Sequence, residues 1–197
     1  MVLASAAGAA LDVRSGLGGV ASAVGALREL VGQAGPRLKG VCAARGPGSY
    51  VGVRSALALA IGLAQARQLP LRLVGSLAVV ADTVDPSGGE LLVVVAAGRG
   101  GLYLQRFRSA GATPDRHWQA LGPAVTDRGP SFPAELLAGA DHLLDPMDAA
   151  PQVRLPRAHP VRSGAEALAR LGMRAEPTSS SYDLVSADYG ARQGGAP

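Results

Sequence analysis

The chain has 197 residues, of which 48% are hydrophobic and 17% are charged, a composition that excludes an intrinsically disordered protein. The net charge is only +4 and the arginines are dispersed, so composition alone favours an ordinary solvated surface over a nucleic-acid-binding one. Cys42 is the single cysteine, which excludes an internal disulfide framework. The apolar start lacks a basic leader and no segment reads as a bilayer span, so we expect a cytoplasmic protein without a membrane segment.

The first half of the chain alternates between predicted strands and helices. Small apolar residues predict a strand over 2–10, and helical periodicity after a potential cap at Ser15 predicts a helix over 17–34. The next predicted elements are a short buried strand over 38–44, a helix over 51–68, a strand over 71–74 and a helix over 77–83. This alternation is typical of an α/β fold.

A second block follows a Pro-Ser-Gly-Gly run at 86–89, which predicts a hinge or linker. Residues 91–97 and 102–108 are predicted to pair as a β-hairpin across a glycine-rich turn. The later predictions are a strand within 118–125, a helix over 133–138, a proline-rich loop over 146–160, and a helix over 163–172 with a Ser163–Glu166 capping box. We therefore divide the chain into residues 1–86, residues 90–176 and a partly frayed tail over 177–197.

Residues 46–54 read Gly-Pro-Gly-Ser-Tyr-Val-Gly-Val-Arg and connect a predicted strand to a predicted helix. The glycines permit positive φ and close backbone approach, and the start of the helix offers free N–H groups to an anion. No Gly-Lys-Ser/Thr follows, and the glycine spacing does not fit a dinucleotide fingerprint. The pattern by itself leaves open both a tight structural turn and a phosphate-binding loop.

This segment resembles the GPGSFTGLR signature of the TsaB (YeaZ) family, and the resemblance extends over roughly residues 40–83. It rests on Gly46, Pro47, Gly48, Ser49, Tyr50, Gly52 and Arg54. The resemblance implies an actin-like, RNase H-like fold of two lobes. It also implies an accessory, non-catalytic subunit of the complex that forms N6-threonylcarbamoyladenosine at adenosine 37 of tRNAs. The implied partners are a TsaD-like catalytic subunit and a TsaE-like ATPase, with tRNA contacted indirectly.

The resemblance further implies that the first two helices form the interface with the catalytic subunit. Both predicted helices carry apolar residues on more than one face, which favours contact with a partner over simple coverage of their own sheet. Pairing of two copies of the chain when it is alone is left open. The residues expected at the interface are Leu17, Val20, Val24, Leu27, Val51, Ser55 and Leu59.

The chain departs from the family pattern at its start, where the opening strand pair and its Asp-Thr-Ser turn are absent. We therefore expect a first lobe without its first two strands, through either a misassigned start or a genuine loss. Val51 replaces the usual threonine, and the 96–103 hairpin turn keeps Tyr103 but lacks both acids of the family pattern. From these departures we expect that the chain contributes no catalytic residues.

No metal or resident cofactor is expected, although a nucleotide at a partner interface is left open. One alternative is a nucleotide-binding enzyme of the actin/sugar-kinase superfamily, which would need an acidic Mg²⁺ site facing the glycine loop. Its nearest candidate ligands, Asp12, Glu29 and Asp82, lie in no recognisable phosphate motif. The other alternative is a degenerate copy without function. The scattered histidines, His117, His142 and His159, are interpreted as surface or loop residues.

Overall fold

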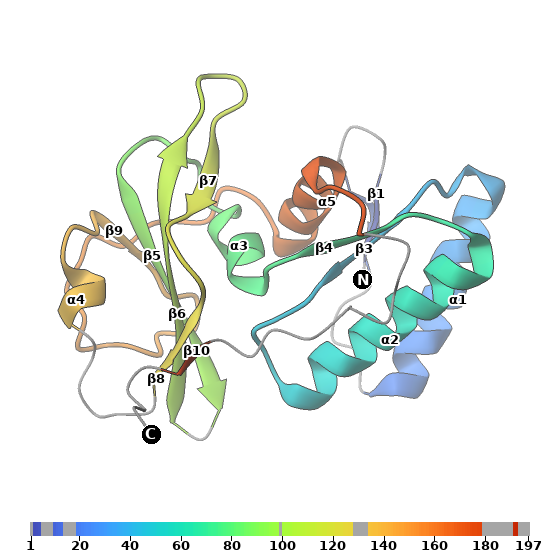
Figure 1. Cartoon of the computed structure of the whole chain (residues 1–197), viewed down its shortest axis with the longest axis horizontal. Coiled ribbons are helices and arrows are strands. Elements are labelled where there is room, and N and C mark those ends of the chain that lie inside the picture. Colours follow the sequence, from blue (N-terminus) through green and yellow to red (C-terminus); the bar gives the residue numbers. More distant parts are fainter. Residues whose placement is uncertain are drawn as a thin grey trace.

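The computed structural model describes residues 2–4, 10–13, 19–98, 100–127, 134–178 and 191–192. The strands are β1 (Val2–Ala4), β2 (Ala10–Val13), β3 (Val41–Ala44), β4 (Leu71–Val74), β5 (Glu90–Gly98), β6 (Gly101–Ala110), β7 (His117–Ala120), β8 (Val125–Asp127), β9 (His142–Leu144) and β10 (Ala191–Arg192). The helices are α1 (Val20–Ala34), α2 (Tyr50–Arg67), α3 (Ser76–Ala81), α4 (Ala134–Leu137) and α5 (Gly164–Arg174), with a 3-10 turn η1 at Gly35–Arg37. Figure 1 shows the β5–β6 sheet on one side, α1 and α2 on the other, and α3 and α5 between them.

The predicted α/β class is confirmed, and its central feature is a crossover from β3 through α2 to β4. The two strands pair in parallel, from Val41 opposite Leu71 to Ala44 opposite Val74. One stripe of α2 packs onto this pair. It consists of Val53, Leu57, Ala60 and Ala64, which are three or four residues apart and therefore share one helix face.

The largest sheet runs in the order β10-β8-β6-β5-β9, with β7 also paired to β6. The predicted β-hairpin is present as antiparallel β5 and β6, in which Glu90 lies opposite Arg108. Both faces of β5 are buried: Leu91 and Val93 cluster with α3, whereas Leu92 and Val94 cluster with Ala150 and Val153 in the segment after β9. A strand buried on both faces has a continuous apolar run instead of an alternating one, as the sequence of β5 shows.

Helix α5 packs between α3, which contacts β5 and β6, and the strands of the first half of the chain. It contacts α3 as well as the β3, β4, β1 and β2 strands. The predicted capping box at its start is confirmed, since the Ser163 hydroxyl accepts from the Glu166 N–H and the Glu166 carboxylate accepts from the Ser163 N–H. The segment after α5 continues the packing, because the Thr178 N–H donates to the carbonyl of Leu71 at 2.8 Å.

Several sequence predictions are wrong in detail. A single strand over 2–10 is replaced by an antiparallel pair, β1 and β2, with Val2 opposite Val13. Helix α1 begins at Val20 with Gly19 at its N-cap, so the cap is not Ser15. The single strand within 118–125 is two strands, β7 and β8, and β9 was not predicted at all. β9 has only three residues, too few for a periodic pattern to show.

Candidate functional site

The glycine loop between β3 and α2 is a tight corner held by hydrogen bonds to two other elements. Gly46 has φ of 108°, a conformation that L side chains rarely adopt. The Gly46 carbonyl accepts from the Ser76 N–H at 2.7 Å, and the Gly48 carbonyl accepts from the Tyr103 hydroxyl at 3.2 Å. These contacts fasten the loop to the start of α3 and to β6.

The start of α2 is capped by the chain itself. The Ser49 hydroxyl accepts from the Gly52 N–H at 3.1 Å, and Ser49 has the extended backbone of an N-cap residue. A Cβ on Gly48 would lie 3.0 Å from a methyl group of Val53, so the loop also packs closely on the first turn. Because one of the helix N–H groups that an anion would use is already bonded, the geometry favours the structural-turn interpretation of this motif.

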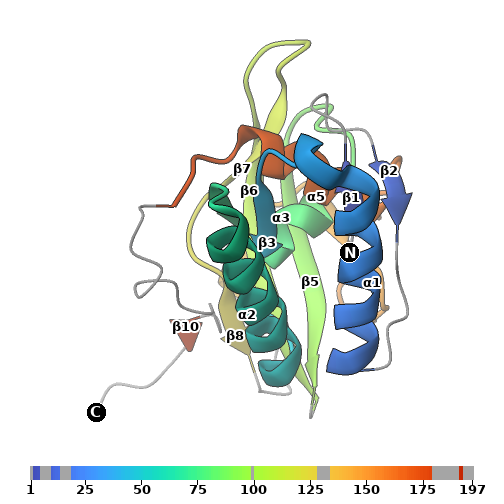
Figure 2. The same cartoon turned by 90° about the vertical axis from the view of Figure 1, so that its right-hand side faces the viewer.

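The outward side of α1 and α2 exposes apolar side chains. The exposed fractions are 69% for Val51, 57% for Tyr50, 50% for Val20 and 38% for Val24. Figure 2 shows the two helices side by side on the face turned to the viewer, with the β5 and β6 strands behind them. We call this surface the α1–α2 face and define it by Val20, Val24, Gly25, Gly32, Val51, Ala58 and Gly62.

The predicted interface residues fall on this face to different degrees. Val20, Val24 and Val51 are exposed, whereas Leu27, Ser55 and Leu59 are half-buried at its margin. Leu17 lies outside the described residues. Their role at an interface stays a prediction.

Three glycines inside these helices have no close neighbour that would exclude a larger side chain. A Cβ built on Gly25, Gly32 or Gly62 would meet nothing within 4 Å. A glycine in a helix interior costs about 1 kcal/mol relative to alanine. The sequence indicates only that glycines lower helix propensity, whereas the structure shows that no packing within the described residues requires these three.

At the N-terminal end of α2, the Arg54 guanidinium lies over the Tyr50 ring, 4.1 Å from the ring centroid. This cation–π contact holds two exposed side chains of the signature motif against each other. Both side chains remain exposed to solvent.

The acidic residues considered for a nucleotide site are not assembled into one. Asp82 is buried and paired with Arg170, with 3.2 Å between Oδ2 and Nε. Burial raises the pKa of Asp82, and the nearby Arg170 and Arg162 oppose that rise. The Asp12 carboxylate accepts from the Gln33 side chain at 2.9 Å. Within the described residues, no group of three His, Cys, Asp or Glu could hold a metal ion.

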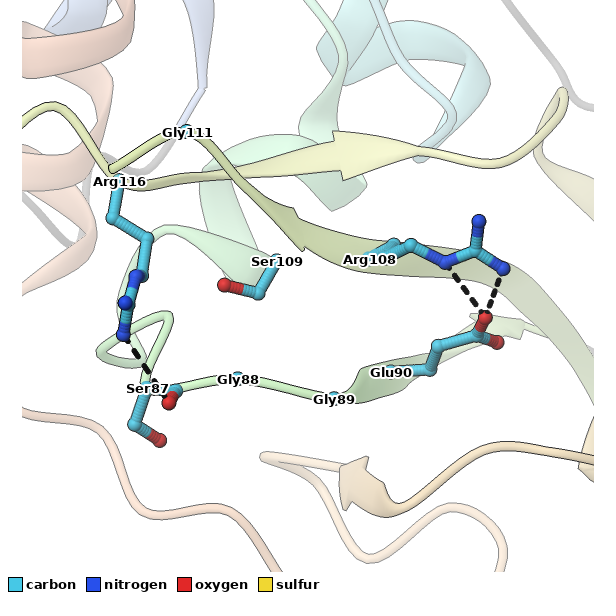
Figure 3. Close-up of a pocket in the computed structure, with 8 residues that line it drawn as sticks. All are labelled: Ser87, Gly88, Gly89, Glu90, Arg108, Ser109, Gly111 and Arg116. Atoms are coloured by element: carbon cyan, nitrogen blue, oxygen red, sulfur yellow. Dashed lines mark hydrogen bonds and ion pairs between the residues drawn. The ribbon is translucent and has the colours of Figure 1, made fainter. Parts of the chain in front are cut away.

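A pocket of about 370 Å³ lies between the 87–89 turn and the β6–β7 connection. Figure 3 shows Arg108 and Arg116 at opposite ends of it. The Arg108 Nε donates to Glu90 at 3.0 Å, and Arg116 donates to the Ser87 carbonyl at 3.3 Å. The hydrogen bond from Arg108 lowers the pKa of Glu90. These polar groups satisfy one another, so we assign the pocket no ligand.

Comparison with known proteins identifies a matching family model and two solved structures with a similar fold. A family model described as "TsaD: tRNA N6-adenosine threonylcarbamoyltransferase" matches residues 21–127, more than half of the chain. The solved structure "YeaZ from Pseudomonas aeruginosa" is similar with a TM-score of 0.60 and 18% identity, covering 86% of this chain and 83% of that one. A second structure from Pseudomonas aeruginosa, of an uncharacterized protein with similarity to peptidase YEAZ, has a TM-score of 0.61 and 20% identity over 84% of this chain and 81% of that one. No curated protein matches in sequence.

The fold is therefore the mixed α/β fold of actin-like type that YeaZ structures share. The chain belongs to the TsaD family and is a TsaB (YeaZ)-like member of it. No helix in the described parts of the chain has the length and apolar character needed to cross a membrane.

Proposed function

We propose that this chain is a non-catalytic accessory subunit in the formation of N6-threonylcarbamoyladenosine at adenosine 37 of tRNAs. Its role is to bind a TsaD-like catalytic subunit through the α1–α2 face. The observation that carries the proposal is the combination of exposed valines and unexplained glycines on that one surface.

The α1–α2 face has the chemistry of a surface that is covered in a complex. Val51, Ala58 and Gly62 are seven and four residues apart, so they form one exposed stripe along α2. Burying an exposed valine contributes about 1.5–3 kcal/mol, and the small residues let a partner helix approach closely. The buried stripe of α2 lies on the opposite side, so covering the exposed one would not disturb the core.

The non-catalytic part of the proposal is supported by the arrangement of the glycine loop and the acids. The loop is bonded to α3, to β6 and to its own helix start, and Asp82 is engaged with Arg170. Binding of a TsaE-like ATPase follows from the resemblance and belongs to the same proposal, whereas self-association of the free chain is left open.

The test measures binding to the TsaD-like subunit of the same organism by titration calorimetry. We expect Val51→Asp to weaken binding at least tenfold, because a carboxylate would be buried against an apolar partner surface. Val161→Asp is the matched control, since Val161 is 62% exposed and does not belong to the α1–α2 face. Equal affinity of Val51→Asp and wild type would contradict the proposed interface.

Gly62→Ala separates binding from folding. The added methyl group meets nothing in this chain, so we expect a more stable protein, by up to about 1 kcal/mol, that binds the catalytic subunit more weakly. Gly164→Ala, at another helical position without neighbours, is the control that leaves binding unchanged. Loss of binding with a gain in stability cannot be explained by misfolding.

A further inference from the structure

Positive charge is concentrated in one part of the molecule, although the whole chain is only moderately basic. Residues 19–81 contain a single acid, Glu29. The rest of the chain has slightly more acids than bases. The basic residues of this part are Arg28, Arg37, Lys39, Arg45, Arg54, Arg67 and Arg72.

Four of the basic positions meet at one edge of the β3–β4 pair. Arg37 closes η1 and Lys39 shortly precedes β3, while Arg67 ends α2 shortly before β4. Because β3 and β4 are parallel neighbours, these two connections lie at the same edge, and the Val41 N–H donates to the Pro70 carbonyl at 2.9 Å there. Arg72 follows at the start of β4. In Figure 1, the C-terminal ends of α1 and α2 both point to the right of the view.

The end of α5 adds a fifth cation. Arg72 Nε donates to the Ala175 carbonyl at 3.0 Å, which places the last turn of α5 and its Arg174 beside β4. We call the set Arg37, Lys39, Arg67, Arg72 and Arg174 the basic end.

The charge of the basic end faces solvent. Arg37, Lys39, Arg67 and Arg174 are exposed, and Arg72 is half-buried. The hydrogen bonds of Arg37 and Arg72 go to the carbonyls of Gln33 and Ala175, which do not cancel a positive charge. Several arginines elsewhere in the described residues do pair with carboxylates, as in Arg106–Glu90, Arg157–Asp148 and Arg170–Asp82.

Helix capping explains only part of this arrangement. Arg37, Arg67 and Arg174 are in last turns, where a cation interacts favourably with the helix dipole. Lys39 and Arg72 are not at helix ends, so the dipole does not account for them. Glu176 is the one acid adjacent in sequence to the last turn of α5.

We propose that the basic end binds the phosphate backbone of the tRNA on which the catalytic subunit acts. The inference rests on the proposed function, and it replaces the expectation that tRNA is contacted only indirectly. The cations of the basic end come from separate loops and helix ends along one edge of the β3–β4 pair. Binding of a phosphate backbone requires such positive charge but no pocket for a base. The basic end also lies at the C-terminal ends of α1 and α2, so a partner on the α1–α2 face would leave it open at the margin of the complex.

The experiment measures binding of an unmodified tRNA transcript by fluorescence anisotropy, to the chain alone and to its complex with the catalytic subunit. The test variant is Arg37→Glu, Lys39→Glu and Arg67→Glu combined; Arg72 is retained because it bonds to Ala175. We expect affinity to fall at least tenfold, and the dependence of log K on log salt to become shallower by about one for each phosphate that the variant no longer neutralises.

Single substitutions supply the matched control. Arg67→Glu and Arg154→Glu make the same change of charge at exposed positions, but Arg154 is outside the basic end. We expect Arg67→Glu to weaken tRNA binding several-fold more than Arg154→Glu does. Arg67→Gln, which removes the charge without reversing it, is expected to show a smaller loss in the same direction, and thermal melting checks that each variant is folded.

Unchanged tRNA affinity and salt dependence in the folded triple variant would overturn the inference, and so would equal losses for Arg67→Glu and Arg154→Glu. A triple variant that loses the catalytic subunit but keeps tRNA would show that the basic end meets an acidic protein surface instead. Failure of the wild-type chain to bind the catalytic subunit would refute the proposed function, while tRNA binding by the chain alone would still decide the present inference.

Discussion

Gly172 and Gly62 occupy similar positions inside helices, but their surroundings give them opposite roles. A Cβ on Gly172 would lie 2.8 Å from both Cβ and Sγ of Cys42 in β3, whereas Gly62 has no neighbour within 4 Å. Burial under α5 also raises the pKa of Cys42 to about 11. Gly172 is therefore needed for α5 to approach β3, and Gly62 is available to a partner.

The contrast predicts opposite effects of the same substitution. Gly172→Ala is expected to lower the free energy of unfolding by about 1–3 kcal/mol, because overpacking outweighs the better helix propensity of alanine. Gly62→Ala is expected to raise it by up to about 1 kcal/mol. Urea denaturation of both variants measures the difference, and an unchanged Gly172→Ala protein would show that α5 can move away from Cys42.

Among the elements, the β5–β6 hairpin depends on one acid at its end. Glu90 is paired with both Arg106 and Arg108 across the hairpin. The bond from Arg108, supported by the charge of Arg106, holds the pKa of Glu90 below its ordinary value of 4.5. A folded-state pKa that is lowered contributes stability above the unfolded pKa, and this contribution is lost as the pH falls through the folded pKa.

Glu90→Gln should therefore reduce stability at pH 7 and reduce it less in acid. We expect a loss of about 1 kcal/mol at pH 7, a small value because the Arg108 side chain is 60% exposed and screened by solvent. The variant and the wild type should converge as the pH falls through the lowered pKa of Glu90. Urea titrations at several pH values test this, and a difference that does not change with pH would rule out the ionised pair as its cause.

At the scale of the whole molecule, α5 and α3 link the β3–β4 pair to the large sheet, because α5 contacts β3, β4 and α3, and α3 contacts β5 and β6. Arg170 on α5 pairs with the buried Asp82 after α3, and Arg162 donates to the carbonyls of Asp82 and Val84. The proposed division at residues 86–90 stays a prediction, but these contacts indicate that the two parts unfold together.

Arg170→Ala should destabilise the whole molecule in a single transition. Removing the partner of Asp82 is expected to cost about 1–3 kcal/mol at pH 8, discounted because the Arg170 side chain is 35% exposed. Burial already raises the pKa of Asp82, so the carboxyl can take up a proton in acid and the loss should be smaller at pH 5. Trp118 fluorescence and circular dichroism should report the same midpoint; two midpoints would show independent parts.

An element of secondary structure could be predicted from the sequence where the residues that specify it are close together along the chain. The capping box at Ser163, the β5–β6 hairpin and α2 were predictable, because caps, turns and periodic stretches act within a few residues. The β1–β2 pair and β9 were missed, because short strands form only when a neighbour supplies the hydrogen bonds. For the candidate site, the exposure of Val20, Val24 and Val51 fits the prediction, while their role is untested.

The sequence by itself determined the α/β class and, through the signature at residues 46–54, the resemblance to a family. Both depend on residues that are close together along the chain. The tertiary structure decided which side of α2 is covered, since an almost wholly apolar helix carries no marker of its buried face. It also decided that cations far apart along the chain meet at one edge, which follows from the parallel pairing of β3 with β4. Such proximity is a property of the packed chain, and no spacing in the sequence encodes it.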